Sequence, residues 1–310
     1  MTVEGSLLQM VKGRGVVSLV GNTPMVRLSR LERPDGPKIY AKLEMLNPGG
    51  SVKDRPAVYM ILDGVRRGLL TREKTILDAT SGNTGVAYSM VAAALGYRVK
   101  MVVPANASRL KVAKMLSLGA EIVFTDPLEG MDGAIKKAVE IYESDPDMYF
   151  YPDQYSNPMN PRAHYETTGP EIMAQTGGRI THLIAGVGTS GTLAGTSQYL
   201  RERRPGVRIV EVQPEGEFHG IEGLKNMNGS MRPSLYRDQI GDMLFRIPTE
   251  EAEETARKLL LKEGIPAGTS SGAALAAALR LSVDLDSGLI VVILPDGLQV
   301  GGEGVRRVRP

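Results

Sequence analysis

The chain has 310 residues, of which 42% are hydrophobic and 23% are charged, so it can bury a large core in one large domain or two. Its 37 Lys and Arg nearly balance its 35 Asp and Glu, and this removes the electrostatic case for binding nucleic acid or an acidic membrane surface. The absence of Cys excludes disulfides, thiolate metal sites and a cysteine nucleophile, and with only three scattered His we expect no metal site.

The N-terminal segment 1–20 lacks the basic start and apolar core of a signal peptide. The apolar run 86–103 is interrupted by Arg98 and Lys100, so it is a poor membrane span. We therefore expect a cytoplasmic protein that acts on small ligands.

Residues 47–55 read Asn-Pro-Gly-Gly-Ser-Val-Lys-Asp-Arg and lead from a glycine-rich turn into a helix expected over Asp54–Arg67. An isolated lysine is usually solvated, and this is the simplest interpretation of Lys53. A helix start disfavours a cation by a few tenths to about 1 kcal/mol, however, unless an anionic group compensates. A desolvated lysine also becomes a good nucleophile. Lys53 is therefore the predicted attachment point of an anionic cofactor.

From residue 74 onward, short β-branched runs alternate with amphipathic or Ala-rich segments, which predicts an α/β fold with mostly parallel sheets flanked by helices. The segment 214–243 lacks periodicity and is expected to be a functional loop. The predicted strands are Thr75–Ala79, Val99–Pro104, Glu121–Thr125, Thr181–Val187, Arg208–Gln213 and Leu289–Leu294. The predicted helices include Val86–Leu95, Ser108–Leu118, Gly133–Glu143 and Leu193–Arg203.

The turn 80–85, Thr-Ser-Gly-Asn-Thr-Gly, links a predicted strand to a predicted helix. Ligands of parallel sheets bind at the carboxyl ends of strands, where helix starts offer N–H groups and hydroxyls to anions. The same residue types also form ordinary helix caps, and so does Ser270 in the segment 268–272. Gln154 follows the strand-like segment 148–151 and by itself indicates only a turn.

The segment 186–192, Gly-Val-Gly-Thr-Ser-Gly-Thr, also follows a strand and opens a helix, so it can cradle a phosphate. Gly186, Gly188 and Gly191 additionally spell G-x-G-x-x-G, and Glu211 lies 20 residues beyond Gly191, which is a dinucleotide-binding fingerprint. An NAD(P)-binding protein is therefore an alternative, although it leaves Lys53, the turn 80–85 and Gln154 unexplained.

These motifs, together with Gly-Asn-Thr-Pro at 21–24 and Lys-Leu-Glu at 42–44, resemble the cysteine synthases of the pyridoxal-phosphate (PLP) β-family, fold type II. The resemblance extends from Gly21 to Asp296. It implies a larger domain of residues 1–46 plus 157–310, a smaller and mobile domain of residues 47–156, and PLP in the cleft between them. A homodimer is expected, because two-fold dimers dominate soluble oligomers.

The resemblance also assigns roles to residues. Lys53 would form the Schiff base with PLP and move the Cα proton, Asn83 would bind the phenolic oxygen, and Ser270 would face the pyridine nitrogen. The phosphate would be held by Gly188, Thr189, Ser190, Gly191 and Thr192. The substrate carboxylate would be held by Thr80, Ser81, Gly82, Thr84 and Gln154. A neutral serine at the ring nitrogen leaves it a weaker electron sink, which favours β-elimination over transamination.

The expected reaction is β-replacement on an O-activated L-serine, with a sulfur donor, to give L-cysteine. Lys225, in the segment Leu-Lys-Asn-Met at 224–227, aligns with an arginine that binds phosphate in the O-phosphoserine-using branch, so O-phosphoserine is favoured and O-acetylserine is the alternative. Expected protein partners are a sulfur-carrier protein, as a thiocarboxylate donor beside free sulfide, or serine acetyltransferase.

Cystathionine β-synthase and serine/threonine dehydratase are alternatives of the same fold, although the chain has no cysteine-histidine haem segment. A catalytically silent partner-binding protein is an alternative of another class, which the presence of Lys53 disfavours. The segment 294–300, Leu-Pro-Asp-Gly-Leu-Gln-Val, departs from the family pattern, so the role of the tail stays open.

Overall fold

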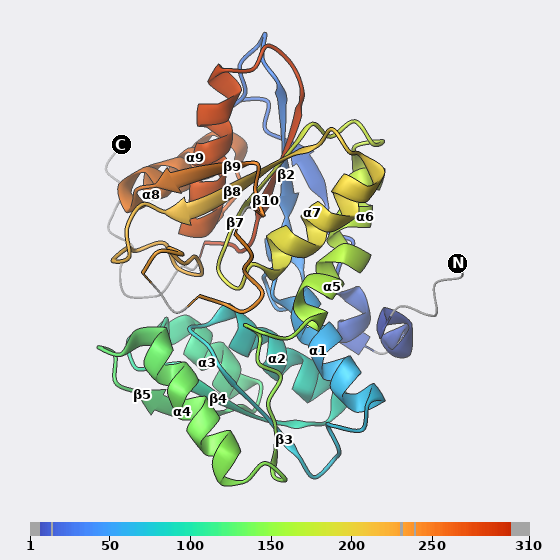
Figure 1. The fold of residues 1–310 in the computed structure, drawn as a ribbon, viewed down its shortest axis with the longest axis vertical. Coiled ribbons are helices and arrows are strands. Elements are labelled where there is room, and N and C mark those ends of the chain that lie inside the picture. The colour runs from blue at the N-terminus through green and yellow to red at the C-terminus, as the bar shows by residue number, and fades with distance from the viewer. Residues whose placement is uncertain (1–6, 14, 230–231, 239, 299–310) are drawn as a thin grey trace.

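The computed structural model describes residues 7–13, 15–229, 232–238 and 240–298. Within them the chain forms a six-stranded sheet and a four-stranded sheet, in the upper and lower halves of the molecule in Figure 1. The α/β fold with mostly parallel sheets that the sequence predicts is confirmed.

The six-stranded sheet collects strands from both ends of the chain, in the order β1-β2-β10-β7-β8-β9, and only the pair β1 and β2 is antiparallel. Its strands are Met25–Arg27 (β1), Lys38–Leu43 (β2), Leu289–Leu294 (β10), His182–Gly186 (β7), Arg208–Pro214 (β8) and Met243–Ile247 (β9). Its helices are Met159–Glu166 (α5), Thr168–Gln175 (α6), Gly191–Arg203 (α7), Thr249–Lys258 (α8) and Thr269–Val283 (α9).

Helices α8 and α9 cover one face of this sheet, and α7, backed by α5 and α6, covers the other (Figure 1). Val292 of β10 accordingly packs into the core on the α9 side, whereas its neighbour Val291 packs into the core on the α7 side. Burial on both faces explains why β10 is an unbroken apolar run rather than an alternating one.

The four-stranded sheet is wholly parallel, in the order β5-β4-β3-β6. Helices α1, α2 and α3 pack against one face, and α4 packs against the other. The strands are Thr75–Ala79 (β3), Arg98–Pro104 (β4), Glu121–Thr125 (β5) and Tyr149–Phe150 (β6). The helices are Asp54–Arg66 (α1), Asn83–Leu95 (α2), Arg109–Ser117 (α3) and Gly130–Ser144 (α4). Short 3-10 helices span Leu7–Val11, Gly15–Leu19 and Glu44–Leu46, and a π-helical turn spans Leu259–Glu263.

The six predicted strands correspond to β3, β4, β5, β7, β8 and β10, with ends shifted by one residue at most. Helices α2 and α7 begin at Asn83 and Gly191, two or three residues before their predicted starts, because polar turn residues already form their first turns. Sequence patterns did not single out β1, β2 or β9, which are short or interrupted by Lys and Arg. The described part of 215–242 contains turns without helix or strand, as its lack of periodicity predicts.

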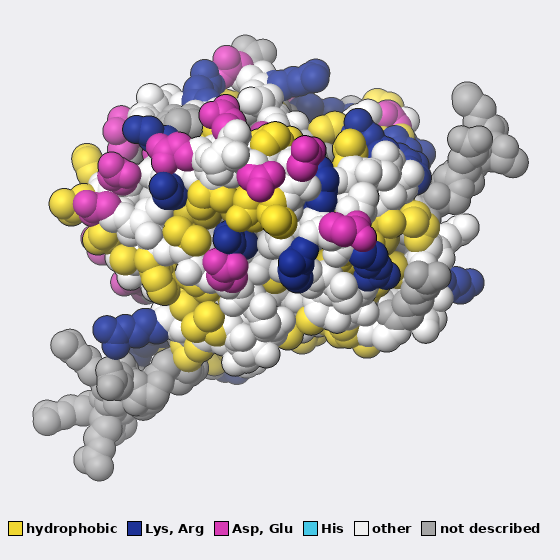
Figure 2. All heavy atoms as spheres, turned by 90° about the horizontal axis from the view of Figure 1, so that it is seen from below, with side chains coloured by type: hydrophobic (Ala, Val, Ile, Leu, Met, Phe, Trp, Pro, Cys, Tyr) yellow, Lys and Arg dark blue, Asp and Glu magenta, His cyan; other side chains and the backbone are white. Residues whose placement is uncertain are grey.

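The strands of the two sheets fall on either side of the predicted limits at residues 46 and 157, so the two-domain division stays a prediction that the topology supports. On the face seen in Figure 2, basic and acidic side chains are interspersed, so this face carries charges of both signs. Among the described residues, every helix is too short or too polar to cross a bilayer.

Candidate active site

One pocket is lined by segments that follow the carboxyl ends of three parallel strands, β3, β7 and β10. Residues from both halves of the molecule form its walls, with the turn 80–84 in the four-stranded half and the turn 188–192 in the six-stranded half. The predicted site residues that line it are Lys53, Thr80, Ser81, Asn83, Thr84, Gln154, Gly188, Thr189, Ser190, Thr192, Lys225 and Ser270. The two other predicted residues, Gly82 and Gly191, are buried in the same two turns.

Lys53 immediately precedes α1, where its backbone already has helical dihedrals. The turn before it is fixed to the segment after β10, because the Val52 N–H donates to the Pro295 carbonyl at 2.8 Å. Burial lowers the pKa of Lys53 to about 8, with the carboxylate of Asp296 opposing the shift and the ammonium of Lys111 adding to it. The pocket therefore holds an amine that is far closer to neutrality than an exposed lysine.

The glycine turn before Lys53 is shaped by Asp54, the first residue of α1. The Gly49 N–H donates to the Asp54 carboxylate, and a Cβ at Gly49 would lie 2.5 Å from Asp54 Oδ1. Burial raises the pKa of Asp54 to about 7. A side chain at position 49 would therefore displace the start of the helix that follows Lys53.

The turn 80–85 is tied together by its own hydroxyls. Thr80 Oγ1 accepts from the N–H groups of Gly82 and Gly85, at 2.9 and 3.1 Å. Thr84 Oγ1 donates to Gln154 Oε1 at 2.7 Å, which brings together two residues 70 positions apart. Gln154 Nε2 in turn donates to the Ala79 carbonyl at 2.8 Å. Thr84 and Gln154 must exchange these bonds if they bind a ligand, whereas Ser81 is partly exposed in the pocket.

The turn at the start of α7 fits a phosphate group. Ser190 adopts the left-handed conformation with φ of 73°, and among the described residues its buried hydroxyl lacks a hydrogen-bond partner. Gly188 and Gly191 leave no space for a Cβ, which would overlap the Gly223 carbonyl and the Asn160 side chain, respectively. An unpaired hydroxyl at the N-terminus of a 13-residue helix is a suitable donor for an anion.

His164 lies behind this turn as a buried residue of α5, with Nδ1 2.9 Å from Thr168 Oγ1 and Nε2 3.2 Å from Thr192 Oγ1. Burial holds the pKa of His164 well below its usual value, so the imidazole is neutral. The sequence assigned no chemistry to His164, and its contacts describe a packed residue that supports Thr192.

Asp296, which lies behind the pocket lining, is the main residue whose role sequence reasoning missed. Asn83 Nδ2 donates to its Oδ2 at 2.8 Å, and Ser270 Oγ donates to its Oδ1 at 3.3 Å. It therefore joins two side chains from opposite sides of the pocket. Its place just after β10 was the available signal, because ligand sites form at the carboxyl ends of parallel strands. The predicted divergence at residues 299 and 300 lies outside the described residues.

Lys225 enters the pocket from the connection between β8 and β9, with its side chain only 13% exposed. Its Nζ lies 3.6 Å from Asp132 Oδ1 and 5.4 Å from the centre of the Tyr155 ring. The Lys225 side chain is therefore largely enclosed at the pocket rather than solvated. Lys111 of α3 and Glu222 of the same connection also line the pocket, and sequence patterns singled out neither residue.

Glu211, required by the dinucleotide fingerprint, is buried in the middle of β8 and does not line the pocket. It accepts hydrogen bonds from Gln213 Nε2 at 2.6 Å and from the Tyr236 hydroxyl at 3.0 Å. Gln213 also accepts from the Met227 N–H at 3.0 Å. Glu211 thus anchors the connection that carries Glu222 and Lys225, and this occupied carboxylate disfavours the NAD(P)-binding alternative.

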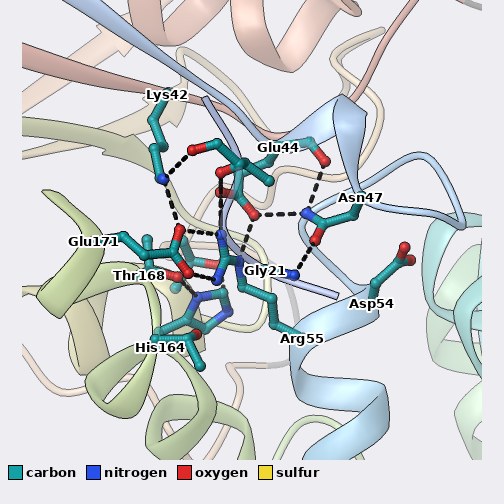
Figure 3. A network of polar contacts seen from close by, with 12 residues as sticks. Gly21, Lys42, Glu44, Asn47, Asp54, Arg55, His164, Thr168 and Glu171 are labelled. Atoms are coloured by element: carbon teal, nitrogen blue, oxygen red, sulfur yellow. Dashed lines mark hydrogen bonds and ion pairs between the residues drawn. The ribbon is translucent and has the colours of Figure 1, made fainter. Parts of the chain in front are cut away.

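A buried ion cluster joins the helix after Lys53 to the rest of the fold (Figure 3). The guanidinium of Arg55 donates to both oxygens of Glu44, at 2.7 and 2.8 Å, and to both oxygens of Glu171, at 2.6 and 2.8 Å. Lys42 Nζ lies 2.6 Å from Glu171 Oε2. Burial would raise the pKa of Glu44, but Arg55 outweighs it and holds that pKa below its usual value. Asp54, one residue before Arg55, points away from this cluster (Figure 3).

Comparison with known proteins places these features in a family. Residues 16–296 match the family described as pyridoxal-phosphate dependent enzyme. A cysteine synthase of Aquifex aeolicus is 47% identical over 289 residues, which cover 91% of this chain and 88% of that protein.

Two solved structures are also similar. A hydrogen sulfide-producing enzyme of Fusobacterium nucleatum superposes with a TM-score of 0.87 at 35% identity, covering 91% of this chain and 97% of that one. An O-acetylserine dependent cystathionine β-synthase of Helicobacter pylori superposes with a TM-score of 0.85 at 39% identity, covering 91% and 94%.

The ion cluster yields a stability prediction. Arg55→Met should lower the free energy of unfolding by about 3–5 kcal/mol, because it leaves the buried carboxylate of Glu44 without its close counter-ion and removes one of the two cations at Glu171. Arg66→Met, on the same helix but with a side chain that is 57% exposed, should cost less than about 1 kcal/mol. Urea denaturation of both variants measures the difference, and equal losses would contradict the central role of Arg55.

Proposed function

This chain belongs to the pyridoxal-phosphate dependent enzymes and, among them, to the family of the cysteine synthases, and from that premise we propose that it makes L-cysteine from O-phosphoserine. One observation carries the proposal: a lysine amine with a pKa of about 8 shares a pocket with a phosphate-binding turn and with a second, ligand-facing lysine, Lys225. PLP, the cofactor of the family, draws electron density from Cα of the amino acid joined to it, and this permits loss of the β-substituent.

Lys53 would hold the cofactor covalently through its amine. With the substrate bound, the Lys53 amine would accept the proton from its Cα atom. Desolvation favours each of these roles, because a neutral amine is both the nucleophile and the base. Asp296 limits the fall of the pKa, so that the amine can still carry the proton it accepts.

The cofactor phosphate would lie on the turn 188–192, where the Ser190 hydroxyl has no hydrogen-bond partner in the described part of the chain and Thr189 and Thr192 add further hydroxyls. Asn83 and Ser270, both bonded to Asp296, would face the cofactor ring. The serine hydroxyl carries no charge with which to hold the ring nitrogen protonated, consistent with β-replacement rather than transamination.

The substrate carboxylate would lie on the turn 80–84, with Ser81 and Thr84 as donors and Gln154 beside them. These residues belong to the four-stranded half, whereas the phosphate turn belongs to the six-stranded half. Movement of residues 47–156 toward the rest of the chain would close the pocket and exclude water during the reaction.

Lys225 would neutralise the phosphate that leaves the substrate. Its only charged partner among the described residues is Asp132, at 3.6 Å and about half exposed, so a phosphate can replace that contact. A lysine binds phosphate as a point charge, whereas an arginine binds it through two parallel hydrogen bonds. Lys225 would therefore recognise the phosphate by its charge rather than by bidentate geometry.

Cystathionine synthesis is the second candidate, favoured by the similarity to the Helicobacter pylori enzyme described above. Measuring product formation from O-phosphoserine and O-acetylserine, each with sulfide and with homocysteine, separates the candidates. Cysteine from O-phosphoserine and sulfide is the expected main product. A sulfur-carrier thiocarboxylate as donor, serine acetyltransferase as a partner and a homodimeric state stay predictions for binding assays.

The pKa of Lys53 predicts the pH dependence of cofactor uptake. Only the neutral amine reacts, so the rate at which the apoprotein takes up PLP should rise with pH up to about 8 and level off above it. An ordinary lysine would continue the rise to about pH 10.4. Absorbance of the bound cofactor measures the rate.

Lys53→Ala should abolish the yellow covalent adduct between the protein and PLP, which borohydride reduces in the wild type. Lys262 is an exposed lysine outside the pocket, so Lys262→Ala should leave the adduct unchanged. An adduct that persists in Lys53→Ala would rule out the assignment, and co-purified NAD(P) in the wild type would support the dinucleotide alternative.

Substrate choice supplies a further prediction. Lys225→Ala should lower kcat/KM for O-phosphoserine by about one to two decades, because it removes a charge-assisted contact worth roughly 1.5–3 kcal/mol. The value of kcat/KM for O-acetylserine should stay unchanged. Lys225→Arg keeps the charge and should retain the preference. Equal losses on both substrates, or a wild-type preference for O-acetylserine, would refute the assignment of the leaving group.

A further inference from the structure

A third lysine, Lys111, lies in the pocket, and the roles assigned so far do not use it. Lys111 extends from α3 with a side chain that is only 2% exposed. Its Nζ lies 2.6 Å from Glu222 Oε1 and 3.8 Å from Asp296 Oδ2. Asp296 already accepts hydrogen bonds from Asn83 and Ser270, so Glu222 is the close partner of this ammonium.

The ion pair lies directly on the turn 80–84. Gly82 has no side chain, and the Lys111 stem occupies the space that a Cβ there would need. Glu222 Oε1 would lie 3.3 Å from the same Cβ. A carboxylate of the protein therefore rests against the turn at which a substrate carboxylate is expected, with a buried ammonium as its counter-ion.

The two partners differ in how firmly they are held. Lys111 is enclosed on a helix of the four-stranded half, where a buried cation needs an anion nearby. Glu222 comes from the connection 215–242 of the other half, and its side chain is 43% exposed. Glu222 can turn into water at little cost, whereas Lys111 cannot, so an incoming anion would replace Glu222 and leave Lys111 in place.

We propose that Lys111 binds the α-carboxylate of the amino-acid substrate and that Glu222 is an internal stand-in anion that occupies this position until the substrate arrives. The inference rests on the proposed function only in that the substrate is an amino acid. Lys111 contacts the turn 80–84, whereas Lys225 contacts Asp132 and Tyr155, so the two lysines would divide the two anionic groups of O-phosphoserine between them.

L-Alanine is the suitable probe, because it has the α-carboxylate and no leaving group. Its dissociation constant from the holoenzyme follows from the change in cofactor absorbance and from the rise in Tm with concentration. Lys111→Met should raise the dissociation constant of L-alanine about ten- to a hundredfold. It should also raise KM equally for O-phosphoserine and O-acetylserine. Lys114→Met, an exposed lysine on the same helix, should change neither quantity.

Glu222→Gln removes the negative charge that competes with the substrate carboxylate, so it should lower the dissociation constant of L-alanine about two- to fivefold. It alters a half-exposed side chain, so it tests the inference even if Lys111→Met does not fold. When Glu222→Gln is combined with Lys111→Met, it should no longer increase the affinity for L-alanine, because Glu222 competes with the ligand only through Lys111. Lys111→Arg keeps the charge and should retain most of the affinity.

Weaker L-alanine binding in Glu222→Gln would overturn the inference, since the pair would then be a latch that closes over the substrate. Unchanged binding in Lys111→Met would overturn it as well. Failure of the proposed leaving group is distinguishable: Lys225→Ala would then affect O-phosphoserine and O-acetylserine equally, while the L-alanine results for Lys111 and Glu222 would stand.

Discussion

Burial of the Arg55 guanidinium is the constraint on which the rest of this structure depends. A buried cation is tolerated only when its donors are satisfied. Here two carboxylates from distant segments, Glu44 and Glu171, accept four hydrogen bonds from the guanidinium, and Thr23 Oγ1 accepts another at 3.1 Å. Glu44 follows β2, and Glu171 belongs to α6. The start of α1 is thereby fixed against the six-stranded half, and Lys53, two residues before Arg55, acquires a defined position.

The same arrangement explains why the pocket has one fixed wall and one that depends on contacts across the cleft. The start of α1 and the turn 188–192 are held to the six-stranded half by buried contacts. The turn 80–84 and α3 belong to the four-stranded half, and they meet the opposite half at the pocket through Asp296 and Glu222. Ligand binding therefore acts on these polar contacts rather than on the apolar cores.

The sequence predicted what local signals encode and missed what depends on tertiary placement. Buried parallel strands such as β10 are unbroken apolar runs, and the turns 80–85 and 188–192 concentrate Gly, Ser and Thr, so both could be recognised. Lys111 lies in a helix with an ordinary pattern of charged residues, and Glu222 lies in a connection without periodicity. Nothing local marks them as partners, since a contact over 111 positions is created by the fold. The Glu44–Arg55–Glu171 cluster was missed for the same reason.

The charges of the pocket also explain how one lysine can serve as nucleophile, base and proton carrier near neutral pH. With an ordinary pKa of about 10.4, only about one amine in a thousand is neutral at pH 7.5, whereas with a pKa of about 8 about a quarter are. Burial supplies most of this change, and the Lys111 ammonium adds to it. Asp296 works in the opposite direction, so the amine remains basic enough to remove a proton from carbon. The positive charges of the three pocket lysines are balanced by the nearby carboxylates of Asp296, Glu222 and Asp132. An anionic substrate can replace part of this negative charge when it binds.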